Sequence, residues 1–183
     1  RKAEIGSLKF TREYLCVPIS TGTSLFNPDF VEACKNKDYV LKLGHRKDKG
    51  YKYYVGVDPA ISTDGDYNVI TVIEVDAEMN KTIVHIDRAK NVEFRENLDK
   101  IRLIGKIFQP EAIFYETNTF AKAFTQELRN ISDLNIHDFN TTRKKKQEII
   151  LNLQMNIENG KMRFPYGDEA SRRVMNKLIE ELS

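Results

Sequence analysis

An acidic residue stands at the end of each of two short apolar segments, where folding could bring the two carboxylates together. Asp58 closes the segment 51–58, in which Val55 and Val57 are β-branched and therefore favour a strand. Pro59 cannot donate a hydrogen bond to a neighbouring strand, so we expect this strand to stop at Asp58. Taken alone, an Asp-Pro pair is also typical of a simple turn.

The second acid, Glu116, follows the continuous apolar run 112–115, which is typical of a strand covered on both faces. Two strands that present carboxylates at the same end predict one shared site. Carboxylate oxygens suit Mg²⁺ or Mn²⁺ better than zinc. The three histidines are scattered without the spacing of a zinc site. We therefore expect a divalent metal bound by oxygen ligands.

The periodicity of apolar residues predicts an α/β fold. Strands are expected near 51–58, 68–75, 82–88, 112–116 and 135–139, and helices near 94–108, 120–128, 149–157 and 170–182. The first three strands have short links, which predict an antiparallel meander, and the later ones need right-handed parallel crossovers. If the fourth strand pairs with the first, the sheet is mixed, with five strands in the order 3-2-1-4-5, flanked by helices. Asp58 and Glu116 would then lie where the chain reverses its direction across the sheet, which is the usual place for a site.

Local signals also predict several helix ends. Asn27 is expected to cap a short helix that has Pro28 at its first position. Gly160 is expected to end the third helix of the main fold, and Asp168 to cap the last one.

Composition bounds the possible functions. We expect a lead-in or linker segment over 1–50 and one domain over 51–183. The formal net charge of +2 excludes neither nucleic acid nor a small substrate. Two cysteines without a CxxC motif predict reduced thiols in a cytosolic setting. No apolar run reaches transmembrane length, so we expect no membrane partner. The chain lacks a GxxxxGK[ST] phosphate loop, so it has no ATPase site of that kind. Because it begins at Arg1, we expect it to be a piece of a longer protein.

The chain resembles the RNase H-like superfamily of metal-dependent nucleases, and within it the nuclease domain of phage terminase large subunits. The segments 55–60 (VGVDPA) and 64–67 (DGDY) resemble the first acidic motif of that family, and 113–118 (IFYETN) resembles the second. The stretch 144–165 resembles the approach to the third motif, and 10–15 (FTREYL) resembles the join to an ATPase domain. Each motif is short, but their order and spacing match together.

The resemblance implies a nuclease that cuts double-stranded DNA during viral genome packaging in the host cytoplasm. Asp58 would bridge two divalent ions about 4 Å apart, and Glu116 would hold one of them. Asp66 is either an assisting carboxylate or a residue of the Asp-Gly-Asp turn. The third acid of the family is expected beyond Ser183, so we expect these 183 residues to bind one ion weakly, with a preference for Mn²⁺. The implied partners are an ATPase domain of the same chain, the portal protein and the small terminase subunit.

A basic run opens the expected third helix and consists of Arg143, Lys144, Lys145 and Lys146. Such a run is usually a solvated face. However, cations at a helix N-terminus oppose the helix dipole, and DNA phosphates would offset that cost. We therefore expect a DNA contact here.

Two other functions fit the same residues. The chain could be another enzyme of the superfamily, such as a junction resolvase or a transposase core. Alternatively, it could be a DNA-binding or docking module without catalytic activity, in which the acids are structural. Coupled binding of divalent ions would separate the enzymes from that module.

Overall fold

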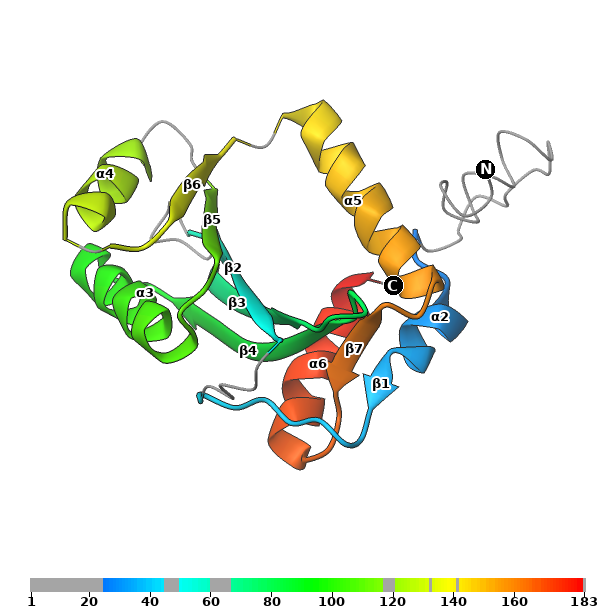
Figure 1. The fold of residues 1–183 in the computed structure, drawn as a ribbon. Coiled ribbons are helices and arrows are strands. Elements are labelled where there is room, and N and C mark those ends of the chain that lie inside the picture. The colour runs from blue at the N-terminus through cyan, green and yellow to red at the C-terminus, as the bar shows by residue number, and fades with distance from the viewer. Residues whose placement is uncertain are drawn as a thin grey trace. The chain divides into compact units, whose positions relative to one another are not determined.

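The computed structural model describes residues 25–44, 50–59, 67–116, 121–131, 133–140 and 142–182 (Figure 1). These residues form two compact units. One holds the described residues from 41 to 141, and the other holds those up to Val40 and from Thr142 onward. The division into 1–50 and 51–183 stays a prediction. None of the helices in the described residues is long and apolar enough to cross a membrane.

A mixed sheet forms the centre of the unit that spans residues 41–141. Its strands are β2 (Lys52–Asp58), β3 (Tyr67–Val75), β4 (Lys81–Lys90), β5 (Ala112–Glu116) and β6 (Ile136–Phe139). They lie in the order β4-β3-β2-β5-β6, with β3 antiparallel to its neighbours and β2, β5 and β6 parallel. The predicted order 3-2-1-4-5 is therefore confirmed for these five strands, including the pairing of the fourth strand with the first.

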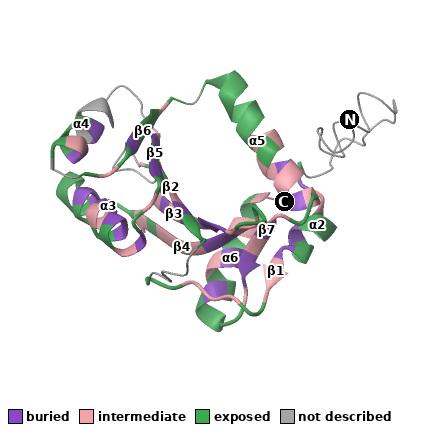
Figure 2. Ribbon diagram, in the orientation of Figure 1, coloured by how far each residue is buried: buried purple, intermediate pink, exposed green. Residues whose placement is uncertain are grey.

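Two helices, α3 (Phe94–Phe108) and α4 (Ala121–Ile131), pack on one face of this sheet (Figure 1). Side chains alternate along β2, so that Val55 and Val57 are buried while Gly56 and Asp58 are exposed. The buried side forms the core with apolar residues of α3 and with Leu128 of α4. Figure 2 marks these buried residues along the strands and along α3. The opposite face, which carries Asp58, is not covered by α3 or α4.

The second unit pairs two short strands in parallel. It contains α2 (Pro28–Ala33), β1 (Lys35–Asn36), α5 (Arg143–Glu158), β7 (Met162–Pro165) and α6 (Glu169–Leu182). The expectation of five strands was therefore too low, because the described residues hold seven. A strand of two residues such as β1 is too short to show any periodicity, and β7 is only four residues long.

The predicted helix ends of this unit are confirmed. The side chain of Asn27 accepts a hydrogen bond from the Asp29 N–H at 2.9 Å, and Pro28 is the first residue of α2. The Asp168 carboxylate accepts one from the Ser171 N–H at 2.7 Å, just ahead of α6. Gly160 follows α5 with φ of +65°, a conformation that favours glycine.

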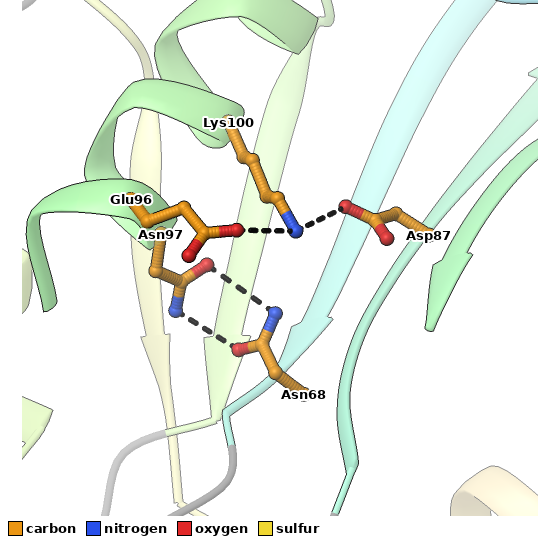
Figure 3. A network of polar contacts seen from close by, with 5 residues as sticks. All are labelled: Asn68, Asp87, Glu96, Asn97 and Lys100. Carbon is orange, nitrogen blue, oxygen red and sulfur yellow. Dashed lines mark hydrogen bonds and ion pairs between the residues drawn. The ribbon is translucent and has the colours of Figure 1, made fainter. Parts of the chain in front are cut away.

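A buried pair of amides joins the start of β3 to the first turns of α3 (Figure 3). The Asn97 amide donates to the Asn68 carbonyl at 2.9 Å, and the Asn68 amide donates back at 3.4 Å. Both side chains are buried. Each amide therefore supplies the hydrogen bonds that water would otherwise make.

We predict that Asn97→Ala lowers the free energy of unfolding by about 1–3 kcal/mol, because it leaves the buried Asn68 amide without its partner. The double replacement Asn68→Leu/Asn97→Leu should cost less than Asn97→Ala, because it removes both polar groups together. Urea denaturation of the variants measures this difference. A double variant that is less stable than Asn97→Ala would contradict the prediction.

Candidate active site

Asp58 and Glu116 end two neighbouring parallel strands at the same level. In the pairing of β2 with β5, Val57 lies opposite Tyr115, and Asp58 and Glu116 follow directly. Adjacent strands are about 4.8 Å apart, so the two Cα atoms are separated by roughly one strand spacing. The structure thus brings together the two acids that the sequence predicts.

The strand alternation places both carboxylates on the face of the sheet that lies opposite α3 and α4, which we call the open face. Val57 and Tyr115, the preceding residues, are buried in the core against the helices, so the next side chains belong to the other face. Asp58 is exposed, and Glu116 is partly exposed. Burial raises the pKa of the Tyr115 hydroxyl, and the nearby Asp58 carboxylate raises that pKa further. Tyr115 therefore stays neutral beside the acid pair.

Two carboxylates at adjacent positions repel each other, and a divalent cation between them would offset the repulsion. Their oxygens are the donors that Mg²⁺ and Mn²⁺ favour. Within the part of the chain that the structure describes, no group of three or more His, Cys, Asp or Glu side chains is placed to hold a metal ion. Asp66, the other predicted site residue, lies outside the described residues. The acid pair therefore fits as part of a metal site.

The open face also carries an aromatic pair that the sequence analysis did not single out. The rings of Phe114 and His137 stack with centroids 5.4 Å apart and an interplanar angle of 25°. Phe114 is 44% exposed and lies opposite Gly56 of β2. It stands two residues before Glu116 and so shares its face, which is the one signal that could have predicted it. The two rings therefore form an exposed aromatic surface next to the acid pair.

The basic run belongs to the other unit and begins α5. Arg143, Lys144, Lys145 and Lys146 are all exposed. The Thr142 hydroxyl caps the helix by accepting a hydrogen bond from the Lys145 N–H at 3.3 Å. The first turn of α5 contains no acidic residue. The positive end of the helix dipole and the four cations therefore repel each other there, which destabilises this end of the helix.

The sequence comparison gives one family. A family model described as the terminase RNase H-like domain matches residues 55–183. The chain belongs to this terminase RNase H-like family. The match contains both Asp58 and Glu116, as well as the basic run of α5. The predicted resemblance is therefore confirmed. No curated protein matches the chain significantly.

Solved structures show the same fold. The large terminase nuclease of the thermophilic phage G20c with bound magnesium superposes with a TM-score of 0.65 at 18% identity, covering 86% of this chain and 80% of that one. The large terminase of bacteriophage HK97 gives 0.57 at 12% identity, covering 79% of this chain and 34% of that one. The terminase nuclease domain of human cytomegalovirus gives 0.51 at 12% identity, covering 86% and 84%. This chain therefore shares the fold of these terminase structures.

Proposed function

We propose that this terminase RNase H-like domain is a metal-dependent endonuclease that cleaves double-stranded DNA during viral genome packaging. The observation that carries this proposal is the acid pair, Asp58 and Glu116, in register on adjacent parallel strands and on the face of the sheet opposite α3 and α4. The family match adds support, because it includes both strands.

In this proposal Asp58 and Glu116 would hold the metal through their carboxylate oxygens. The bound ions would supply an activated water and would stabilise the leaving oxygen of the phosphodiester. The two acids fix where that chemistry happens, because each is anchored by a core residue directly before it in the strand. Gly56 presents no side chain to the same face, and the space in front of it is open. Asp66 is proposed as a residue that assists this pair.

Mg²⁺ or Mn²⁺ is the proposed metal, and two ions are expected in the complete site. The nuclease of phage G20c has been solved with bound magnesium, cobalt and zinc. For this chain, the oxygen-only donor pair supports Mg²⁺ or Mn²⁺ over zinc.

The proposed partners follow from the family. They are double-stranded DNA, an ATPase domain of the same protein, the portal protein and the small terminase subunit. The chain spans about a third of the HK97 large terminase. We place the protein in the host cytoplasm, where viral genomes are packaged.

Incubation with a supercoiled plasmid tests the proposal. Any conversion of the plasmid to nicked and linear forms should require Mg²⁺ or Mn²⁺, and a chelator should prevent it. Calorimetric titration with Mn²⁺ in the absence of DNA measures metal binding separately. If the chain neither cleaves DNA nor binds these ions, the acids are structural and the domain is a docking or DNA-binding module.

The basic run should contribute to DNA affinity without affecting sequence preference. We predict that Lys144→Gln/Lys145→Gln/Lys146→Gln weakens duplex binding equally for unrelated sequences, because the exposed lysines would contact phosphates. The slope of log affinity against log salt should fall by up to about 0.9 for each lost contact. Fluorescence anisotropy with a labelled duplex measures both quantities.

A charge-matched variant of α6 provides the control. Arg172, Arg173 and Lys177 are exposed cations in the same unit. Their replacement by Gln removes the same net charge and should leave the salt slope nearly unchanged. Equal effects of the two triple variants would show that the lysines of α5 are only a solvated face.

A further inference from the structure

Two cations of β4 stack on one tyrosine of β3. The Arg88 guanidinium lies 3.4 Å from the centroid of the Tyr67 ring, and the Lys90 ammonium lies 4.6 Å from the same centroid. We call these three residues the basic–aromatic cluster. Arg88 and Lys90 are exposed, and 36% of Tyr67 is exposed. Two like charges are thus held close together at the surface, an arrangement that an anion would stabilise.

The cluster lies at the same edge and on the same face of the sheet as the acid pair. Val69 of β3 pairs with Asp58 on one side and with Arg88 on the other, so the three form a row across adjacent strands. Tyr67 and Lys90 pair with each other two residues further along and therefore share this face. Two strand spacings separate the Cα atoms of Asp58 and Arg88, which is about 10 Å.

Contacts on the helix-covered face hold the cluster in place (Figure 3). Asn68, the residue after Tyr67, is joined to Asn97 by the amide pair. Asp87, the residue before Arg88, forms an ion pair of 3.1 Å with Lys100, which also contacts Glu96 at 3.2 Å. Both strands are therefore tied to α3 directly behind the cluster. The contacts of the neighbouring residues Asn68 and Asp87 with α3 thus help to fix the positions of Tyr67 and Arg88.

We propose that Arg88 and Lys90 bind backbone phosphates of the DNA next to the phosphodiester that is cleaved, with Tyr67 as their platform. This inference rests on the proposed nuclease function and names the part of the surface that holds its substrate. The acid pair repels the phosphates that flank the cleaved bond. The cations of Arg88 and Lys90, on the same face and two strands away from Asp58, offset that repulsion. A guanidinium stacked on a ring carries its N–H donors at the edge of its plane, in a fork geometry that suits a phosphate. Such contacts position the duplex without reading its sequence.

The test compares two charge-matched double variants in the full chain. Arg88→Gln/Lys90→Gln removes the cations of the cluster. Lys52→Gln/Lys106→Gln removes two exposed cations from the start of β2 and from the last turn of α3, away from the strand ends that carry the acids. Binding of a labelled duplex is measured by anisotropy across a range of salt concentrations, in chelator so that no metal-dependent cleavage occurs. Thermal unfolding of each variant monitors the fold.

The proposal predicts a roughly ten- to thirtyfold loss of affinity at 0.15 M salt for Arg88→Gln/Lys90→Gln, with a salt slope reduced by up to about 1.8. The control variant should keep most of the affinity and the slope. The single variant Arg88→Lys, with Lys90 unchanged, retains both charges and should have the salt slope of the unaltered chain. If the cluster variant loses stability while its salt slope stays unchanged, the stack is structural and the proposal is wrong. Equal effects of the two double variants would overturn it as well.

Plasmid cleavage by the unaltered chain separates this inference from the proposed function. A chain that binds DNA through the cluster but never cleaves it would contradict the nuclease proposal and leave the phosphate contacts standing. If the variant with both cluster cations replaced binds and cleaves DNA normally, the phosphate contacts are contradicted and the nuclease proposal stands.

Discussion

Replacing Asp58 by Asn should reduce the metal-dependent cleavage of DNA by more than about a hundredfold. Loss of residues that merely orient metal ligands already costs about 10–100-fold in affinity or activity, and Asp58 would contact the metal directly. Asparagine has nearly the same shape as aspartate, and the site is exposed, so the fold should remain intact. The initial rate of plasmid nicking in Mg²⁺ or Mn²⁺ measures the effect. Glu116→Gln should act in the same direction.

The same variant has an opposite effect on stability when no metal is present. Asp58 and Glu116 are like charges at adjacent positions of paired strands, so Asp58→Asn should stabilise the metal-free chain by about 0.2–1 kcal/mol. With metal bound, the unaltered chain should be more stable than the variant. At a hundred times its dissociation constant, Mn²⁺ would stabilise the unaltered chain by about 2.7 kcal/mol and the variant by much less. Thermal unfolding with Mn²⁺ and with chelator tests both statements.

Asp99→Asn is the matched control for these measurements. Asp99 is an exposed acid on α3 whose ion pair with Arg102 is long, at 3.7 Å. Its replacement removes one negative charge from the other side of the sheet and should change neither cleavage nor the stabilisation by Mn²⁺. If Asp58→Asn behaves like Asp99→Asn in both assays, Asp58 is not a metal ligand.

The largest effect on stability is expected from Phe108→Ala, which should cost about 3–5 kcal/mol. Phe108 is the last residue of α3 and is fully buried. Its ring lies 5.7 Å from the ring of Tyr53 and 6.2 Å from that of His85, so it fills the space between α3 and two strands of the sheet. Truncation to Ala removes this apolar area from the core and leaves a cavity that the rigid sheet cannot close. Urea denaturation followed by circular dichroism measures the loss.

Leu103→Ala on the same helix provides the comparison. Leu103 is 50% exposed, so its truncation should change the free energy of unfolding by about 0.5 kcal/mol or less. If both variants lose the same free energy, the core around Phe108 is packed more loosely than the structure indicates. Phe108→Leu should recover part of the loss, because it refills most of the volume.

The sequence by itself determined the order of the sheet and the place of the acid pair. Alternating and continuous apolar runs are local features, and the strands from β2 to β5 are long enough to show them. Short links and helical crossovers then restrict the ways in which these strands can be joined. Pro59 and the end of the apolar run at Tyr115 mark where two strands stop, so Asp58 and Glu116 could be predicted at adjacent strand ends. Helix caps such as Asn27 and Asp168 depend on contacts within four residues and were predictable for the same reason.

Only the tertiary structure decided what surrounds the acids. The stacking of Arg88 on Tyr67 depends on the register between β3 and β4, and a shift by one residue would move each side chain to the opposite face. The amide pair of Asn68 and Asn97 joins residues 29 positions apart, and neither residue carries a local signal for the other. The pairing of β1 with β7 likewise brings together segments from the two ends of the chain. Such contacts arise from the packing of distant elements, which periodicity along the chain does not encode.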